Sequence, residues 1–379
     1  MKIQVNRDVL AEAVSFAVKL LPTRSTLPIL GGVLIEATPE GLVLSSFDFE
    51  VSTTSRLAAI VEEPGRVLVL GRLLADIASR LPNAPVNIST EQNKMVVSCG
   101  TSEFTLLSMS IDEYPTIPQV TGETGVVKAE AFAEAAGQVA QAASREDVLK
   151  VISGVLLEVE GKSLNMAATD RYRVAVRSLE WDSNSDEGFA ALVSAKTISE
   201  VGKTFAAAGT ISISLTEVDN RKTIAFSAAN KTVTSLLIAG AFPPVQKLFP
   251  TEAPKYAVVN TADLVEATRR IKLVLERPGF MRCTFGNNKV VLESVTGEQA
   301  QAHETIDAVT NNEELEMQLN AEYLLDGLGA VHSEFTRISF VGGESSLKPG
   351  PVLLTSQTSK DTPGTDNFRY LLQPKPLMR

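Results

Sequence analysis

The chain has 379 residues, of which 44% are hydrophobic and 21% charged, and its formal net charge is −10. This composition favours a folded, soluble, intracellular protein with several cores. No apolar run approaches the roughly 18 residues of a membrane span. Met1 and Lys2 lead directly into a strand-like KIQV with no apolar leader, so we expect a cytoplasmic protein.

Two helix-like motifs recur three times along the chain. The first motif reads VNRDVLAEA from Val5, VKAEAFAEA from Val127 and VNTADLVEA from Val259. The second motif reads GRLLADIASRL from Gly71, AKTISEVGKTF from Ala195 and AEYLLDGLGAV from Ala321. Intervals of roughly 120 to 130 residues exceed the period of a solenoid repeat and match a complete small domain. We therefore predict three similar tandem domains, at 1–121, 122–250 and 251–379.

The first motif of each repeat predicts an amphipathic helix. Its apolar stripe, at the 3-4 spacing of a helix, is formed by Leu10, Val14, Ala17 and Leu21. The polar residues on the opposite side are Asp8, Glu12, Ser15 and Lys19. Such a helix is expected to lie on a sheet.

Alternating runs between the helices predict antiparallel strands. In the run from Leu42 to Leu57, the apolar residues Phe47, Phe49 and Val51 alternate with Asp48, Glu50 and Ser52, which indicates one buried face and one wetted face. Helices on one face of antiparallel sheets give an α+β fold. Aromatic-proline pairs, Tyr114-Pro115 and Phe242-Pro243, are predicted linkers near the repeat ends.

Residues that carry chemistry are scarce. Cys99 and Cys283 lie far apart in strand-like contexts and are expected to be buried free thiols. His303 and His332 are expected to be solvated or capping residues. No nucleophile, metal or nucleotide motif is present, so we predict no enzyme, no metal and no cofactor. One enzyme hypothesis stays open, a hydrolase that uses Asp48 and Asp170, which occupy equivalent places in two repeats.

Basic residues recur in or beside the predicted helices of this acidic chain. They include Arg24, Arg72, Arg80, Lys196, Lys203, Arg269, Arg270, Lys272 and Arg277. A basic helical surface can hold a phosphate backbone without reading its sequence, while the acidic remainder repels nucleic acid. Ordinary solvated helix faces would give the same pattern.

Several segments together resemble one bacterial family. They are TLPIL from Thr26, GRLLADI from Gly71, EYPTIP from Glu113, ATDRYRVAV from Ala168 and AFPPVQKLFP from Ala241. Over essentially the whole chain this combination resembles the β subunit of DNA polymerase III, the sliding clamp, of the actinobacterial type.

The resemblance implies a non-catalytic processivity subunit. In that family a head-to-tail homodimer closes six clamp domains into a ring, with the sheets outside and two helices per domain lining a hole for duplex DNA. The DNA-facing set would then be Arg24, Arg72, Arg80, Lys196, Lys203, Arg269 and Arg270. The dimer interface would include Leu106, facing Lys272 and Leu273.

The family also has a hydrophobic groove between its second and third domains. The groove captures short motifs of the polymerase α subunit, the clamp loader, other polymerases and repair proteins. Matching positions here are Ile152, Thr169, Tyr172, Arg173, Val174, Pro243, Lys247, Leu248, Pro349, Pro351, Leu372, Gln373, Pro374, Lys375, Pro376 and Leu377, with Arg173 expected to orient the motif. Val174 and Leu248 could equally be ordinary core positions.

The chain departs from the family beside this groove. The C-terminal segment from Gln373 to Arg379 replaces the usual thioether by an amide, and Pro349-Gly350-Pro351 interrupts a simpler pattern. The segment SEFTLLSM from Ser102 lacks the arginines that many relatives use at the dimer edge. These departures raise the hypothesis of a divergent second clamp that excludes a clamp-targeting cyclic-peptide antibiotic. Lineage drift at a tolerant surface would produce the same departures. A non-replicative scaffold of repeated domains, which would share the fold but lack DNA enclosure, also stays open.

Overall fold

The computed structural model describes residues 1–22, 27–118, 120, 122–146, 149–183, 187–218, 221–250, 252–276, 279–294, 300–311, 313–345, 348–364 and 367–377. The chain divides into two compact units. Unit 1 comprises Met1–Ala133, Trp181–Asp186 and Thr197–Leu237, and unit 2 comprises Glu134–Glu180, Glu187–Lys196 and Ile238–Arg379. The predicted second domain contributes residues to both units.

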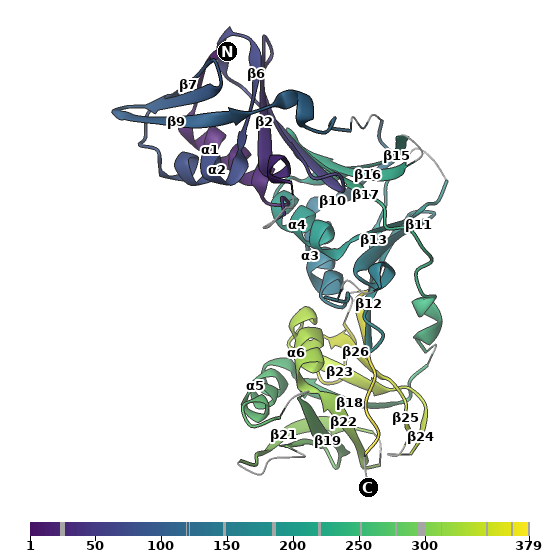
Figure 1. Cartoon of the computed structure of the whole chain (residues 1–379). Coiled ribbons are helices and arrows are strands. Elements are labelled where there is room, and N and C mark those ends of the chain that lie inside the picture. The colour runs from purple at the N-terminus through teal and green to yellow at the C-terminus, as the bar shows by residue number, and fades with distance from the viewer. Residues whose placement is uncertain are drawn as a thin grey trace. The chain divides into compact units, whose positions relative to one another are not determined.

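The described residues form six α-helices. They are α1 (Arg7–Val18), α2 (Gly71–Arg80), α3 (Ala129–Ala140), α4 (Ala195–Phe205), α5 (Thr261–Lys272) and α6 (Ala321–Ala330). Each repeat contributes two of them, as the motifs predict. Within unit 1, α1 and α2 lie side by side, and within unit 2, α5 and α6 do the same (Figure 1).

Unit 1 is built on one antiparallel sheet with strand order β10-β15-β16-β17-β4-β3-β2-β6-β9-β8-β7-β1-β5. Its strands are β1 (Lys2–Val5), β2 (Gly32–Thr38), β3 (Gly41–Phe47), β4 (Val51–Leu57), β5 (Ile60–Glu63), β6 (Gly65–Leu70), β7 (Val86–Glu91), β8 (Lys94–Cys99), β9 (Ser102–Met109), β10 (Gly125–Lys128), β15 (Thr210–Val218), β16 (Arg221–Ala228) and β17 (Lys231–Leu236). The second repeat thus continues the sheet of the first repeat through β17 and β4.

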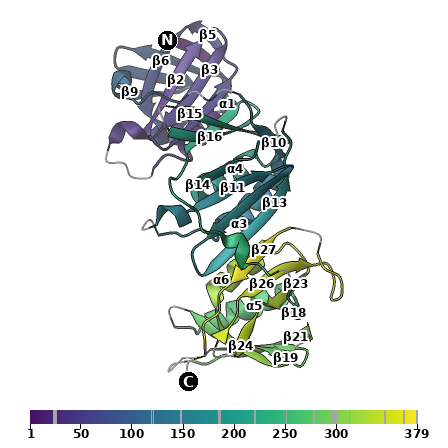
Figure 2. The same cartoon turned by 90° about the vertical axis from the view of Figure 1, so that its right-hand side faces the viewer.

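Unit 2 repeats this plan with strand order β14-β11-β12-β13-β27-β26-β23-β18-β21-β20-β19-β22. Its strands are β11 (Gly154–Glu160), β12 (Ser163–Thr169), β13 (Arg173–Glu180), β14 (Ala190–Ser194), β18 (Lys255–Asn260), β19 (Phe280–Gly286), β20 (Lys289–Ser294), β21 (His303–Thr310), β22 (Leu315–Asn320), β23 (Phe335–Phe340), β26 (Val352–Gln357) and β27 (Arg369–Leu372). Figure 2 shows β27 and β26 beside β23 and β18. A separate two-stranded sheet joins β24 (Gly343–Ser345) to β25 (Lys348–Pro349).

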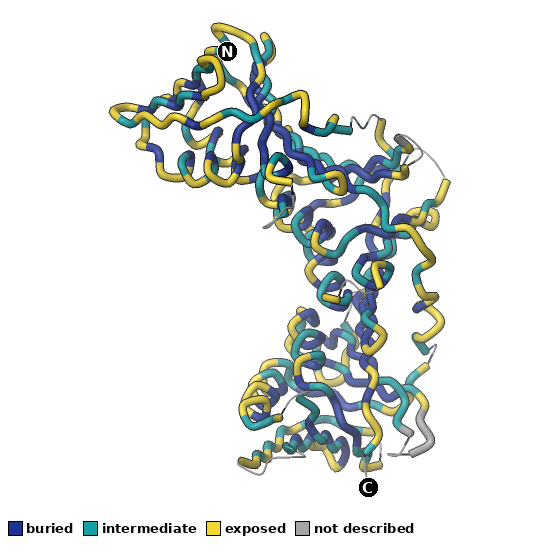
Figure 3. The backbone as a smooth tube through the Cα atoms, in the orientation of Figure 1, coloured by how far each residue is buried: buried dark blue, intermediate teal, exposed yellow. Residues whose placement is uncertain are grey.

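The first helix forms as its sequence predicts. The Asn6 side chain caps it by accepting hydrogen bonds from the backbone N–H groups of Asp8 and Val9. The predicted apolar stripe is buried in the core of unit 1, and the predicted polar side is exposed. Figure 3 shows this division, with buried backbone running through the strands and exposed turns on the helices.

One strand prediction was wrong. The run from Leu42 to Leu57 is two strands, because the chain turns at Asp48, where Oδ1 accepts hydrogen bonds from the N–H groups of Glu50 (3.0 Å) and Val51 (2.7 Å). Phe49 lies in this turn at φ 74° and is exposed. The alternation across Phe49 therefore does not describe one continuous strand.

The same turn recurs in the second repeat. Asp170 Oδ1 accepts hydrogen bonds from the N–H groups of Tyr172 (3.0 Å) and Arg173 (3.1 Å), and Arg171 has a φ of 82°. Short acidic side chains commonly cap turns in this way. The equivalence of Asp48 and Asp170 is therefore explained by backbone capping, with no need for the hydrolase hypothesis.

The two aromatic-proline segments are packed onto the sheets rather than free. Tyr114 is buried, its hydroxyl accepts a hydrogen bond from the Phe47 N–H (2.8 Å), and it packs with Leu34 and Leu68. Burial raises the pKa of Tyr114 to about 12. Phe242 packs against the buried cluster that contains Val174. These aromatic side chains anchor the connections between repeats.

Candidate functional site

Each unit contains one junction at which a strand of one repeat pairs with a strand of the next. In unit 1, β17 pairs with β4 in antiparallel fashion and places Thr234 opposite Ser52. In unit 2, β27 pairs with β13 and places Leu371 opposite Val174. The two junctions have the same architecture, so their side chains can be compared position by position.

The junction in unit 2 has an apolar face. Val174, Leu371 and Leu353 are directly paired across β13, β27 and β26, so their side chains share one face of the sheet. The complete buried cluster on this face is Ala167, Val174, Val176, Val245, Leu353 and Leu371, with Leu156, Phe242, Phe249 and Val341 packed against it. Of this buried cluster, the sequence indicated only Val174.

The corresponding face in unit 1 is polar. Ser52 and Thr234 take the places of Val174 and Leu371, and Ser45 donates a hydrogen bond to Thr54 (3.4 Å) between the adjacent strands. Hydroxyl side chains satisfied by one another give little apolar surface to a ligand. Of the two described junctions, only the one in unit 2 therefore offers an apolar floor.

The segment from Ala241 to Pro250 crosses this apolar face. Its short 3-10 helix, Val245–Leu248, buries Val245 and leaves Lys247 and Leu248 exposed, Leu248 to 52%. Pro243 is exposed. Leu248 follows Val245 of the buried cluster by three residues. Apolar surface that a partner can reach therefore lies next to the buried cluster.

The C-terminal segment lies along the same junction. Leu372 is buried, and the Gln373 N–H donates to the Tyr172 carbonyl (2.9 Å). Lys375 forms a two-way backbone bridge with Gln318 on β22, and its ammonium lies 4.0 Å from the Phe280 ring centroid. The remaining predicted groove residues of this region differ in exposure. Pro374 is buried, Pro376 is exposed, and Leu377 and Pro351 are half-buried. Pro349 pairs with Gly343 in the two-stranded sheet.

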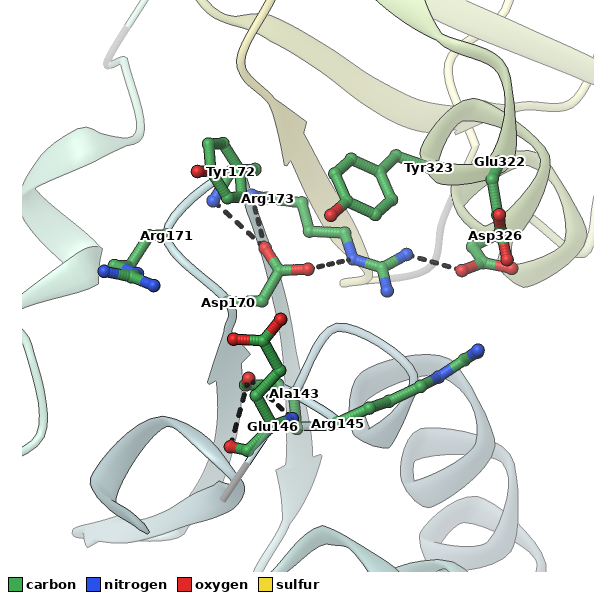
Figure 4. A pocket seen from close by; sticks show the side chains of 11 residues that line it. Ala143, Arg145, Glu146, Asp170, Arg171, Tyr172, Arg173, Glu322, Tyr323 and Asp326 are labelled. Carbon is green, nitrogen blue, oxygen red and sulfur yellow. Dashed lines mark hydrogen bonds and ion pairs between the residues drawn. The ribbon is translucent and has the colours of Figure 1, made fainter. Parts of the chain in front are cut away.

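Arg173 occupies the opposite face of the sheet. Because adjacent strand residues point to opposite faces, its side chain points away from the Val174 cluster. Its Nε donates to Asp170 (2.9 Å) and its Nη1 to Asp326 of α6 (2.5 Å) (Figure 4). The same Nη1 donates to the Tyr370 hydroxyl (3.3 Å). Its guanidinium carbon also lies 4.4 Å from the Tyr323 ring centroid.

This arrangement holds a buried cation in a defined place. Burial alone would lower the pKa of Arg173, but Tyr370 and the carboxylates of Asp326 and Asp170 outweigh it, so the net pKa is raised. Burial also raises the pKa of the Tyr370 hydroxyl. The guanidinium therefore remains charged and joins β13 to α6 and β27.

An open pocket of about 330 Å³ lies beside Arg173. Its lining comprises Ala143, Ser144, Arg145, Glu146, Asp170, Arg171, Tyr172, Arg173, Glu322, Tyr323 and Asp326. Tyr172, which is 56% exposed, stacks on Tyr323 with ring centroids 6.3 Å apart. The pocket carries charges of both signs, so its chemistry differs from that of the apolar cluster.

Two predicted groove residues, Thr169 and Ile152, are buried and form hydrogen bonds within the protein. The Thr169 hydroxyl donates to the Arg173 carbonyl (2.7 Å), which closes the turn at Asp170. The Ile152 carbonyl accepts a hydrogen bond from the Ser144 N–H (2.8 Å). Both residues support the loops around the junction.

The predicted DNA-facing residues lie on the helices, with Arg24 outside the described residues. Lys203 pairs with Glu200 (3.0 Å), Arg269 with Glu266 (2.6 Å) and Arg270 with Glu304 (2.7 Å), and the last contact raises the pKa of Arg270. Arg72 donates to the Leu21 carbonyl (3.2 Å), while Arg80 and Lys196 have no carboxylate partner among the described residues.

The predicted interface residues divide into buried and exposed ones. Leu106 is buried in the core of unit 1, so it is not presented to a partner. Its neighbours Phe104 and Leu107 are 39% and 69% exposed, and Leu273 at the end of α5 is 84% exposed. Lys272 is exposed and lies 3.9 Å from Glu322. The alternation of β9 around Leu106 could have identified Leu107 as exposed, whereas Phe104 lies on the same strand face as Leu106 and is exposed nearer the end of the strand.

The described residues include no group of metal-ligating side chains. Cys99 and Cys283 are buried free thiols, as predicted, and burial raises the pKa of Cys283. His303 lies on β21 beside Glu293, and His332 follows α6 and contacts Glu134 (3.0 Å). Every helix in the described part of the chain is too short or too polar to span a bilayer.

Comparisons with known proteins identify the chain's relatives. Models of the N-terminal, central and C-terminal domains of the DNA polymerase III beta subunit match residues 1–118, 126–244 and 246–358. The chain is 42% identical over 376 residues to the beta sliding clamp of Streptomyces coelicolor, covering 99% of both chains. It is 35% identical over 375 residues to the beta sliding clamp homolog GriR of Streptomyces muensis, again covering 99% of both. A crystal structure of the Pseudomonas aeruginosa sliding clamp bound to griselimycin is similar over 100% of both chains, with a TM-score of 0.89 at 27% identity.

Proposed function

The chain belongs to the DNA polymerase III β-subunit family, the sliding clamps of DNA replication, and on this premise we propose that it encircles duplex DNA as a ring-shaped homodimer. The ring tethers the replicative polymerase in the cytoplasm and has no catalytic role. The domain boundaries 1–121, 122–250 and 251–379 remain part of this proposal.

One observation carries the ring: each unit has one strand that is equivalent to a junction strand but pairs with no strand of another repeat in the described chain. The junctions pair β4 with β17 and β13 with β27. The equivalent strands without such a partner in the described chain are β21 in the third repeat and β9 in the first. A head-to-tail dimer would pair β21 of one protomer with β9 of its partner at two identical interfaces, which closes the assembly.

The basic residues would hold DNA loosely inside this ring. Arg72, Arg80 and Lys196 are exposed cations on α2 and α4 without carboxylate partners among the described residues. Contacts of this kind with phosphates do not depend on sequence, and they weaken as salt rises. Enclosure would then supply the residence time that such weak contacts do not.

The test is retention on DNA of defined topology. The purified chain is loaded by a clamp loader onto a nicked circular plasmid, and retention is measured before and after the plasmid is cut once. We expect a dimer that stays on the circle and is lost on linearisation. Retention indifferent to cutting but abolished by salt would contradict enclosure and favour ordinary DNA binding or the scaffold.

We further propose that the apolar face in unit 2 captures the short motifs of the polymerase α subunit, the clamp loader, other polymerases and repair proteins. The support is the contrast between the two junctions, since only the one in unit 2 combines a buried apolar floor with an exposed Leu248 among the described residues. Apolar anchors in such a floor provide most of the affinity for a short peptide. Arg173 would position the floor from behind.

A second candidate is a divergent clamp with lowered affinity for a cyclic peptide such as griselimycin, which the Pseudomonas aeruginosa clamp binds. The favouring observation is the Pro349–Pro351 segment, in which a Cβ on Gly350 would lie 1.8 Å from the Val341 carbonyl oxygen. Val341 packs against the apolar cluster, so this segment constrains the wall of the groove. A lost contact and a clash together would weaken binding by about 2 to 4 kcal/mol, or 30- to 1000-fold. Calorimetry with griselimycin beside the Streptomyces coelicolor clamp tests this, and equal affinities would exclude it.

A further inference from the structure

We infer the register of the proposed dimer: β21 of one protomer pairs with β9 of its partner so that His303 lies directly opposite Glu103 of the partner subunit. The inference rests on the proposed ring and adds the residues that meet in it. It is derived from the two strand pairings observed inside the chain.

Both strands have a partly free edge. On β9, the residues from Ser102 to Leu107 pair with β8, and Ser108 and Met109 pair with β6. On β21, the residues 303–307 pair with β20, and the last three residues of the strand pair with β18. Both strands therefore present a run of backbone groups that have one ladder partner in the described chain. Such edges are available to a further strand.

Equivalent positions on β4, β13 and β21 follow from their neighbouring strands. Each of these three strands pairs with the strand that precedes it in the chain, namely β3, β12 or β20. We take the residue opposite the fifth residue of that preceding strand as the equivalent position in all three. The resulting pairs are Ser45 with Thr54, Ala167 with Val176 and Glu293 with His303. His303 is therefore the counterpart of Thr54 and Val176.

Equivalent positions on β9 and β17 follow in the same way. Each is the second strand of a hairpin with a two-residue turn, and the first paired residues are Ser102 on β9 and Lys231 on β17. Glu103 is therefore the counterpart of Thr232, and Phe104 is the counterpart of Val233.

The observed junctions then fix the pairing. In unit 1, Thr54 lies opposite Thr232, and in unit 2 the equivalent Val176 lies opposite Arg369. The same alignment at the third junction sets His303 against the partner's Glu103 and Glu304 against the partner's Ser102. The pairing then continues towards residues 302–300, which precede β21. The Glu103 and His303 side chains are both exposed on their strands, as a directly opposed pair on one sheet face requires.

Burial supports this alignment independently. Val233 is 1% exposed inside the completed junction of unit 1, whereas its counterpart Phe104 is 39% exposed on the uncompleted edge. Leu273, next to Lys272 at the end of α5, is 84% exposed. In the inferred register Phe104 lies opposite Ala302, directly before β21, so this pairing would give Phe104 the cover that Val233 already has.

The inferred contact also brings a carboxylate to an imidazole. Glu103 has only a hydrogen bond from the Ser98 hydroxyl (3.3 Å) among the described residues. His303 contacts Glu293 (3.3 Å) and Thr305 (3.2 Å) on its own protomer. A charged or hydrogen-bonded Glu103–His303 pair would take the place of the arginine pairs that this edge lacks.

Disulfide trapping tests the register. The variant with Glu103→Cys and His303→Cys is oxidised and its covalent dimer is quantified on a denaturing gel. The matched control carries Glu103→Cys and Asp307→Cys, which moves the second thiol four residues, about 13 Å, along the same exposed face. The native Cys99 and Cys283 are buried and should not compete.

We expect at least about tenfold more covalent dimer from the matched pair than from the control, because a thiol displaced by about 13 Å cannot meet disulfide geometry. Equal trapping, or more from the control, would overturn the register. Light scattering on the unmodified chain separates failure of the register from failure of the ring. A dimer that the matched pair fails to trap rejects the register alone, whereas a monomer rejects the proposed ring together with it.

A double-mutant cycle tests the side-chain contact. Glu103→Gln and His303→Gln should each raise the dimer Kd by about 2- to 5-fold per interface, and the double variant should add little to either change. Fully additive effects would contradict direct contact between the two side chains. Asp307→Asn, four residues from His303 on the same exposed strand face, serves as the control.

Discussion

Leu248 and Val174 allow a direct test of which side chains bind a partner and which only build the floor. Leu248 is 52% exposed and Val174 is 5% exposed, although both were predicted for the same groove. Burying a whole leucine side chain is worth about 1.5 to 3 kcal/mol. A peptide that covers the exposed half of Leu248 therefore gains roughly 0.8 to 1.5 kcal/mol, so Leu248→Ala should weaken the peptide about 4- to 12-fold.

Val174→Ala should act on folding instead. Its side chain is already withdrawn from water, and removing its methyl groups leaves a cavity beside Leu371 and Leu353. Such truncations cost about 1 to 3 kcal/mol of the free energy of unfolding. Leu248→Ala should change that free energy by less than about 1 kcal/mol, because half of its surface remains in water.

The assay is fluorescence anisotropy with a labelled peptide carrying the clamp-binding motif of the polymerase α subunit, paired with urea unfolding of each variant. Gln246→Ala, an exposed neighbour on the same 3-10 helix, is the matched control. The reasoning fails if Leu248→Ala binds as tightly as the unmodified chain. It also fails if Val174→Ala leaves the free energy of unfolding unchanged.

Three further predictions concern the buried tyrosine, the basic helices and the buried arginine. Because the pKa of Tyr114 is about 12 when folded and about 10 when unfolded, the unfolded state loses its proton first, and stability should fall by up to about 3 kcal/mol as pH rises from 10 to 12. Urea unfolding at about pH 9 and about pH 11 measures this fall, and an equal fall in Tyr114→Phe would refute the assignment. Arg80→Glu and Lys196→Glu should each lower the slope of log K for duplex DNA against log salt by about 1, and unchanged slopes would remove them from the DNA-facing set. Asp326→Asn should cost about 2 to 4 kcal/mol in urea unfolding by leaving Arg173 half-paired, whereas Glu322→Gln on the same helix should cost less than about 0.5, and equal costs would contradict the role of the buried pair.

The periodic elements were predictable because local pattern determines them. The stripe of Leu10, Val14 and Ala17 is buried as a helix of that period requires, and the Asn6 cap fixes where the helix begins. The turn at Asp48 was missed because Phe49 continues an apolar alternation by sequence alone. Phe49 has a φ of 74°, and two backbone hydrogen bonds to the Asp48 carboxylate stabilise the turn. The spacing of apolar residues contains no information about these hydrogen bonds.

The site was predictable only as far as the motif resemblance extended. It located Val174 and the segment around Leu248, but Leu371 and Leu353 come from strands distant in sequence and join the cluster through sheet pairing. Arg173 was expected to orient a bound motif. Its contacts with Asp170 and Asp326 place it on the other face, and the alternation of β13 could have indicated this once the strand's start was known.

The contrast between the two junctions explains how a repeated fold can carry a single groove. Backbone pairing is the same in both, so the architecture alone would predict two equivalent sites per chain. At matched positions Ser52 and Thr234 replace Val174 and Leu371, and the hydroxyl groups of neighbouring Ser45 and Thr54 satisfy each other. A peptide's apolar anchor would gain little there, because it would displace water from polar groups without replacing their hydrogen bonds. Specificity for one junction therefore follows from a few side chains on a shared backbone, and exchanging those side chains should transfer the binding site without changing the strand pairing.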